Sequence, residues 1–192
     1  MSFAGSKPSI LVTGACGYIG SHVARMLSEN GYQVIVIDNL TTGFRDALVH
    51  NETFYQGDVG DVVLLKQVFN KHKIAAIIHF AAAIRVDESV VNPEKYYSNN
   101  TVNTLRLVTT ACEVGIKNVI FSSTAAAYGQ PKVVPVDESA PTSPESPYGW
   151  SKLMSEQMLR DMSAAHGIRN VILRYFNVAG ADPELRLSLI HI

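Results

Sequence analysis

Short apolar runs alternate along the chain with segments in which apolar residues recur at helical spacing. Between the first two runs, Ile19, Val23 and Leu27 share one side of a helix that Gly31 ends. Continuously apolar strands joined by helices predict an α/β fold, a doubly wound parallel sheet of Rossmann type that is covered on both faces. The runs that predict strands are residues 9–14, 33–38, 53–58, 75–82, 118–123 and 170–176.

Three further helices are indicated by the residues at which they begin. Asp61, Asn92 and Ser146 can each accept hydrogen bonds from the first free N–H groups of a helix, and proline follows the last two. Gly115 and Gly167 end the second and third of these helices. The third carries a methionine stripe, which predicts either core packing or, as we prefer, a dimer contact: Met154, Met158 and Met162.

Composition narrows the class of protein. The 192 residues suffice for one domain with its own core, and a net charge of -1 gives no basic surface for nucleic acid. No apolar run is long enough to cross a membrane. Cys16 and Cys112 form no CxxC pair, and the six histidines lack ligand spacing, so we expect a reducing cytoplasm and no metal. His79, which ends a strand, is expected to serve packing rather than catalysis.

A glycine-rich loop follows the first strand. Gly14 permits a tight turn, Gly17 lets the backbone approach a pyrophosphate, and Gly20 allows close helix packing. The following helix offers free N–H groups to the phosphates. Asp38 ends the second strand, where its carboxylate can bind ribose hydroxyls and repel the extra phosphate of NADP. The pattern predicts NAD as the cofactor; the alternative is a tight turn with a surface aspartate.

A candidate catalytic group lies near the end of the chain. Tyr148 and Lys152 are four residues apart and share one side of a helix. A tyrosine pKa of about 10 is too high for a base at neutral pH, so we expect the ammonium and a cationic nicotinamide to lower it. Thr124, after the fifth strand, can orient a reacting hydroxyl, with Ser122 and Ser123 as alternatives.

Longer motifs carry a family resemblance. The glycine loop, "FSSTAAAYG", "SPYGWSKLMSEQ" and "RYFNVAGA" resemble the extended short-chain dehydrogenase/reductase family, in particular its nucleotide-sugar 4-epimerases, from about Ile10 to Pro183. The resemblance implies that tyrosine takes the proton of the sugar's 4-hydroxyl while hydride passes to NAD. The 4-keto sugar then rotates in the site, and hydride returns to its other face. Galactose metabolism and a homodimer are further implications.

The resemblance also assigns residues to roles. Tyr148, Lys152 and Thr124 would be catalytic, and Thr124, Tyr148 and Asn177 would contact the substrate. No residue would bind metal. The cofactor would be bound by Gly14, Gly17, Tyr18, Ile19, Gly20, Asp38, Asn39, Asp58, Val59, Phe80, Ala81, Ala82, Asn99, Ser122, Tyr148, Lys152 and Phe176.

Two departures from related enzymes bear on the reaction. Ala125 and Ala126 follow Thr124, where dehydratases and decarboxylases of the family carry an acid. Some epimerases place a lysine where this chain has Ile84, so either Arg85 replaces that contact or it is missing. Another nucleotide-sugar epimerase, or a sugar or sterol dehydrogenase, remains an alternative. A cofactor-sensing regulator on the same fold is a further one, which the tyrosine and lysine pair argues against.

The resemblance also divides the chain. Residues 1–184 would form the NAD-binding domain, and residues 185–192 would be a non-native tail, with an extension of the sixth strand as the alternative. The smaller C-terminal domain that binds the nucleotide sugar in the family would be missing. We therefore expect the chain to fold around its cofactor site and to be inactive as an epimerase by itself.

Overall fold

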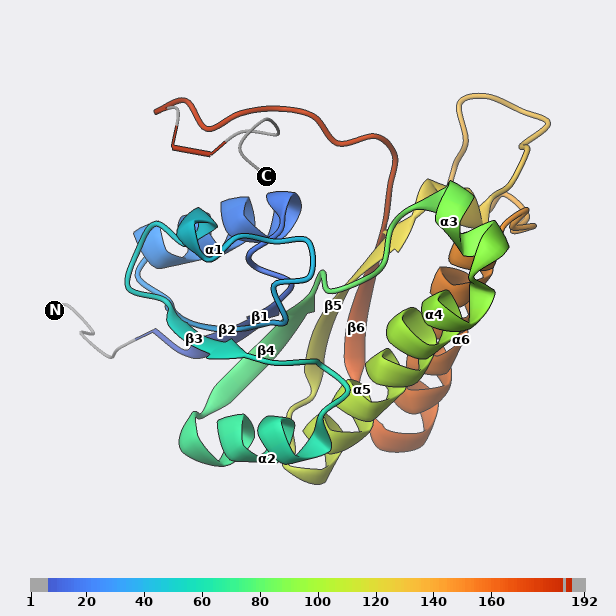
Figure 1. Cartoon of the computed structure of the whole chain (residues 1–192). Coiled ribbons are helices and arrows are strands. Elements are labelled where there is room, and N and C mark those ends of the chain that lie inside the picture. The colour runs from blue at the N-terminus through green and yellow to red at the C-terminus, as the bar shows by residue number, and fades with distance from the viewer. Residues whose placement is uncertain (1–6, 185, 188–192) are drawn as a thin grey trace, which may run out of the picture.

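The computed structural model describes residues 7–184 and 186–187. Its centre is a six-stranded parallel sheet with the strand order β3-β2-β1-β4-β5-β6 (Figure 1). The order reverses between β1 and β4, which is where doubly wound sheets bind their ligands. The predicted fold class is confirmed. The strands are β1 (Ser9–Thr13), β2 (Gln33–Asp38), β3 (Thr53–Gln56), β4 (Ile74–His79), β5 (Asn118–Thr124) and β6 (Arg169–Tyr175).

Three helices begin at the predicted residues. Asp61 accepts hydrogen bonds from two N–H groups of the first turn of α2, and Asn92 and Ser146 each accept one. Gly167 ends α6 in the left-handed conformation, with φ at 68°. The helices are α1 (Tyr18–Glu29), α2 (Val62–Lys71), α3 (Val86–Val91), α4 (Pro93–Tyr96), the π-helix η2 (Tyr97–Val102), α5 (Asn103–Glu113) and α6 (Pro147–His166), with short turns η1 (Arg45–Ala47) and η3 (Ala125–Ala127).

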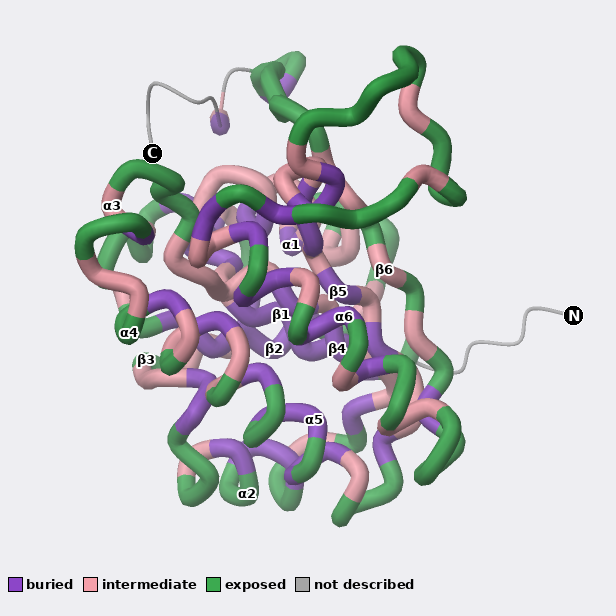
Figure 2. The backbone as a smooth tube through the Cα atoms, turned by 90° about the vertical axis from the view of Figure 1, so that its right-hand side faces the viewer, coloured by how far each residue is buried: buried purple, intermediate pink, exposed green. Residues whose placement is uncertain are grey.

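Helices cover the two faces of the sheet unequally. Helix α1 lies on one face, while α2, α5 and α6 lie on the other (Figure 1). Each face has its own core, because alternate residues of β1 point to opposite sides: Val12 packs on the α1 side and Leu11 on the α2 and α5 side. Figure 2 shows buried backbone concentrated in the central strands.

The sixth strand departs from the predicted pattern. We expected it to be buried on both faces, and this is wrong, since Val171 and Leu173 are 52% and 37% exposed. The reason is its place at the edge of the sheet, beyond the reach of α1. Met158 and Met162 pack against the core beneath α6, whereas Met154 is exposed. The predicted dimer contact stays a prediction.

Four predicted strands end too late, the first and sixth by one residue each. The predicted third strand ends at Gln56 rather than at residue 58, and the fourth ends at His79, so Phe80–Ala82 lie in the following loop. Helix α3 and the π-helix were not predicted. No helix of the described part of the chain is long and apolar enough to span a membrane. The predicted tail 185–192 lies, apart from Arg186 and Leu187, outside the described residues and stays a prediction.

Candidate active site

The glycine loop occupies the first turn after β1. Gly14 has φ at 70°, and a Cβ there would lie 2.5 Å from the Ala81 nitrogen. A Cβ on Gly20 would lie 2.2 Å from the Gly14 oxygen, so both positions exclude a side chain. A Cβ on Gly17 would meet only the Gly14 oxygen, at 3.4 Å. Packing therefore explains Gly14 and Gly20. Gly17 instead leaves open space beside the loop, as a pyrophosphate requires.

The first turn of α1 is suited to an anion. Gly17 caps the helix without a side-chain hydrogen bond, and the first turn carries no acidic residue. The first N–H groups of a helix have no partner within it and carry partial positive charge. Tyr18 and Ile19 lie in this turn, and Tyr18 Oη donates to the Gly180 carbonyl at 2.7 Å. This combination fits the pyrophosphate of a dinucleotide.

Asp38 lies against the glycine loop. It is 7% exposed, and its carboxylate accepts hydrogen bonds from the N–H groups of Cys16 and Leu40, both at 2.9 Å. The alternative of a surface aspartate is therefore wrong. Each carboxylate oxygen keeps a lone pair for a ribose hydroxyl. Burial, with Asp38 nearby, raises the pKa of the Cys16 thiol to about 12, so Cys16 is not a nucleophile at neutral pH.

A second carboxylate organises the loop after β3. Asp58 Oδ1 accepts from the Gly60 N–H at 2.7 Å and from Asn103 Nδ2 at 2.8 Å. Asn39 Nδ2 donates to its other oxygen at 3.3 Å. Val59, beside it, is buried. The predicted cofactor contacts Asn39, Asp58 and Val59 thus lie together, next to Asp38 at the end of β2.

The loop after β4 is fixed by an asparagine that sequence analysis missed. Asn100 is 2% exposed, accepts from the Ala83 N–H at 2.8 Å and donates to the Ala83 carbonyl and to Ser151 Oγ. It thereby ties the segment of Phe80, Ala81 and Ala82 to α6. The predicted residue, Asn99, is half-buried and donates to Asn100 Oδ1 at 3.1 Å.

Helix α6 brings the candidate catalytic side chains to the end of β5. Ser146 caps the helix, which places Tyr148 and Lys152 in its first two turns. The Tyr148 ring meets the edge of the buried Tyr96 ring, with centroids 6.3 Å apart. Thr124 Oγ1 accepts from the Ala126 N–H at 3.1 Å, which leaves its hydroxyl proton free to be donated.

Burial dominates the electrostatics of this pair. Burial raises the pKa of Tyr148, and a hydrogen bond with the Thr124 hydroxyl acts in the opposite direction. Burial lowers the pKa of Lys152 to about 7. The expected lowering of the Tyr148 pKa combined the lysine with the cationic nicotinamide, and it stays a prediction. In the chain itself, Lys152 Nζ donates to the Ser122 carbonyl at 2.8 Å.

The neighbouring serines have different positions. Ser123 is buried, and its hydroxyl donates to Glu156 Oε1 at 2.5 Å, so it is not available to a substrate. Ser122 is half-buried, and its main-chain carbonyl accepts a hydrogen bond from Lys152 Nζ. Of the three hydroxyls considered, Thr124 is the one that faces Tyr148.

Other predicted residues lie apart from this group. Phe176 and Asn177 follow β6 and are exposed, the former by 64%. Arg85 is exposed and pairs with Asp87 at 2.7 Å, beside the exposed Ile84. Whether Arg85 replaces the lysine contact stays open. Among the described residues, no group of three or more histidine, cysteine or acidic side chains is arranged to hold a metal ion.

His79 has the predicted packing role. It is 1% exposed and bridges two hydroxyls: Nδ1 lies 2.6 Å from Thr13 Oγ1, and Nε2 lies 2.8 Å from Thr104 Oγ1. Thr104 donates its own proton to the Asn100 carbonyl, so it must accept from Nε2–H. Burial with the nearby Lys152 charge lowers the pKa of His79 to about 3, so the imidazole is neutral at neutral pH.

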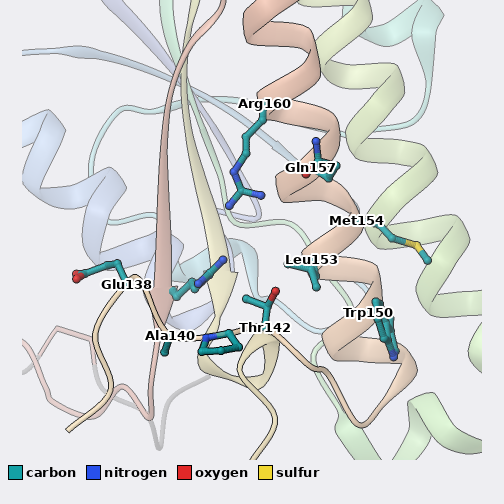
Figure 3. Close-up of a pocket in the computed structure, with 10 residues that line it drawn as sticks. Glu138, Ala140, Thr142, Trp150, Leu153, Met154, Gln157 and Arg160 are labelled. Atoms are coloured by element: carbon teal, nitrogen blue, oxygen red, sulfur yellow. The ribbon is translucent and has the colours of Figure 1, made fainter. Parts of the chain in front are cut away.

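A cavity of about 490 Å³ lies between α6, the loop before it and Arg174 of β6 (Figure 3). It contains none of the predicted site residues. Trp150, Leu153, Met154 and Gln157 reach it from α6, and Ala140 and Thr142 from the preceding loop. The cavity is thus separate from the candidate active site, which is a surface at the carboxyl ends of the strands.

The fold and this site define a class of protein. The chain belongs to the NAD dependent epimerase/dehydratase family, whose model matches residues 10–189. Its curated relatives include UDP-glucose 4-epimerases. That of Azospirillum brasilense is 54% identical over 181 residues, which are 94% of this chain and 52% of the relative. That of Halalkalibacterium halodurans is 49% identical, over 95% of this chain and 54% of the relative.

Solved structures of UDP-glucose 4-epimerases are also similar to this chain. UDP-glucose 4-epimerase from Brucella ovis in complex with NAD has a TM-score of 0.91 and 43% identity, over 94% of this chain and 55% of that chain. The enzyme from Bifidobacterium longum in complex with NAD+ and UDP has a TM-score of 0.90 and 39% identity, over 94% and 56%. The chain therefore spans about half the length of the relatives it matches.

Proposed function

We propose that this chain supplies the NAD-binding and proton-transfer half of a nucleotide-sugar 4-epimerase that interconverts UDP-glucose and UDP-galactose. The observation that carries the proposal is the position of Tyr148 and Thr124 at the end of β5, at the edge of the sheet where the glycine loop lies. The similarity to UDP-glucose 4-epimerases over nearly the whole chain supports the same reaction and substrates.

The residues of the glycine loop and of the two neighbouring strand ends would hold the cofactor. The N–H groups of the first turn of α1 would bind the pyrophosphate beside Gly17, and Asp38 would accept from the ribose hydroxyls. Asn39 and Asp58 would line the adenine. Lys152 would hold the nicotinamide ribose. NAD, when bound, supplies reversible acceptance of hydride from carbon 4 of the sugar.

The remaining chemistry is proton transfer by this chain. Tyr148, as phenolate, would take the proton of the sugar's 4-hydroxyl, and Thr124 would donate a hydrogen bond to that oxygen and orient it. After the 4-keto sugar has rotated in the site, Tyr148 would return the proton. Because burial raises the pKa of Tyr148, the phenolate needs positive charge nearby, which Lys152 can supply when protonated.

We further propose that the chain by itself does not complete the reaction. Proton transfer requires the sugar to be held closely against Tyr148, and small misplacements reduce the rate steeply. The relatives have about as many residues again as they share with this chain, and part of their grip on the nucleotide would lie there. A homodimer, a cytoplasmic location and a role in galactose metabolism belong to the same proposal.

The test uses calorimetry and a chimera. NAD is titrated into the chain, and UDP-galactose conversion is assayed for the chain alone and for residues 1–184 joined to the remaining part of the Azospirillum brasilense enzyme. We expect NAD binding by both proteins and turnover by the chimera only. Absence of NAD binding would overturn the proposed function, while turnover by the chain alone would overturn the proposal that it is inactive. A chimera that folds and binds NAD but releases NADH stoichiometrically would be a dehydrogenase instead.

A further inference from the structure

A buried ion pair joins α6 to the two strands at this edge of the sheet. Glu156 is completely buried, and its carboxylate accepts from Arg174 Nε at 2.9 Å and Nη2 at 2.6 Å. It also accepts from Ser123 Oγ at 2.5 Å, and from Arg160 Nη2 at 2.9 Å on the solvent side. Bidentate pairs between arginine and carboxylate are strong and demand a fixed geometry. Glu156 therefore sets the distance between α6, β5 and β6.

The position of Ser123 links this ion pair to the candidate active site. Ser122, on one side, presents the carbonyl that accepts from Lys152 Nζ at 2.8 Å. Thr124, on the other side, presents the hydroxyl that faces Tyr148. Because the three residues are consecutive in one strand, a shift of Ser123 would move both groups. The Glu156 carboxylate is thus hydrogen-bonded to Ser123, the residue that lies between the Ser122 carbonyl and the Thr124 hydroxyl.

Two further contacts strengthen the link. Tyr148, Lys152 and Glu156 recur at intervals of four residues, so they lie along one side of α6. The Arg174 guanidinium also lies over the Tyr128 ring, 4.7 Å from its centroid. Tyr128 ends the turn η3, which Thr124 begins. The same ion pair thus contacts the chain on both sides of Thr124, at Ser123 and at Tyr128.

Stability alone is a weak explanation for such a pair. Burying two charges is costly, and apolar residues of similar volume often serve a core as well or better. We propose that Glu156 is a positioning residue, which, through Ser123 and Arg174, fixes the Ser122 carbonyl and the Thr124 hydroxyl against Lys152 and Tyr148. The inference deepens the proposed function and rests on it.

The experiment follows Lys152 directly. The Nζ signals of ¹⁵N-labelled lysine are recorded by NMR against pH, and Lys152 is assigned by its absence from Lys152→Met. Ser123→Ala removes one hydrogen bond and keeps the ion pair, so it should fold even where Glu156→Gln does not. Arg160→Gln is the matched control, because it removes a partner of the same carboxylate from the exposed side of α6, where Arg160 is 46% exposed. NAD affinity is measured for each protein.

We expect Lys152 to titrate near pH 7 in the wild type. In Ser123→Ala, and in Glu156→Gln if it folds, freer access of water should raise that midpoint by about one unit, a fraction of the roughly 3–5 units that full burial can cause. Arg160→Gln should leave it unchanged. Unchanged midpoints in both test variants, with only a lower unfolding temperature, would overturn the inference. A wild type that fails to bind NAD would instead count against the proposed function.

Discussion

The ammonium group of Lys152 donates to the main-chain carbonyl of Ser122 at 2.8 Å. The lysine is 3% exposed, and its Nζ also lies 4.9 Å from the centroid of the Phe121 ring. The strand β5 therefore holds the lysine, with Tyr148 beside it rather than bonded to it. Because burial lowers the pKa of Lys152 to about 7, the group exchanges its proton near neutral pH.

The first prediction concerns stability against pH in Lys152→Met. The pKa of Lys152 falls from 10.5 in the unfolded chain to about 7 in the folded one, so the unfolded state binds more protons between these values. Stability should therefore rise with pH across that window, by at most about 1.4 kcal/mol per unit from this group. Lys152→Met should lack this rise. Urea unfolding from pH 7 to 10 measures it, and parallel curves for the two proteins would refute the expectation.

A second prediction separates two glycines by their surroundings. Gly17→Ala should fold with a loss of no more than about 1 kcal/mol, because its Cβ meets only the Gly14 oxygen at 3.4 Å. It should bind NAD about tenfold more weakly, or worse, since the methyl group fills the space for the pyrophosphate. Gly20→Ala should instead destabilise the fold by about 1–3 kcal/mol, as its Cβ would lie 2.2 Å from the Gly14 oxygen. Calorimetry and urea unfolding distinguish the effects, and equal NAD affinity in Gly17→Ala would contradict the assignment.

Much of the fold could be predicted because its signals are local. Helix starts at Asp61, Asn92 and Ser146 depend on hydrogen bonds within a few residues, and the structure contains them. The same holds for the glycine loop, where Gly14 and Gly20 are fixed by nearby backbone. Continuous apolar runs identified the strands, although they failed to show that β6, with Val171 exposed, lies at the sheet's edge.

The rest depends on contacts that no local pattern encodes. Glu156 and Arg174 are 18 residues apart, and their pairing requires the register that sets Ser123 beside Arg174. Asn99 was assigned from the family resemblance, whereas the role of Asn100 depends on contacts with Ala83 and Ser151, which lie 17 and 51 residues away in the chain. Burial raises the pKa of Tyr148, and residue spacing alone does not reveal that burial.

A third prediction addresses cofactor choice through Asp38→Asn, which removes the charge and keeps the shape. The wild type should bind NAD in preference to NADP, because the buried carboxylate would repel the 2′-phosphate. The variant should narrow that preference by about tenfold, which corresponds to about 1.4 kcal/mol. Titration of both cofactors into both proteins measures the ratio. Equal affinities in the wild type would remove the basis for assigning Asp38 to the ribose.

A fourth prediction uses the neutral imidazole of His79. Its pKa falls from 6.5 in the unfolded chain to about 3 in the folded one, so the unfolded state takes up a proton as pH falls through that window. Through His79, acidification should therefore lower the free energy of unfolding by up to about 1.4 kcal/mol per pH unit. His79→Gln should be less stable at pH 7 but should lose less between pH 6.5 and 4.5. His166→Gln, at an exposed position, is the control, and identical acid slopes in wild type and His79→Gln would contradict the argument.

The last prediction concerns Tyr148→Phe. The phenylalanine ring keeps the contact with Tyr96, and only the phenolic oxygen is removed. The chain should therefore fold and bind NAD as before. In the chimera with the Azospirillum brasilense enzyme, turnover should fall by about 10²–10⁴-fold, as expected when a general base is removed. Thr124→Val should cost less, because it removes a hydrogen bond that orients the sugar and leaves the base in place. Turnover of UDP-galactose and NAD affinity are measured together. A rate for Tyr148→Phe within about threefold of the parent chimera would show that another group takes the proton.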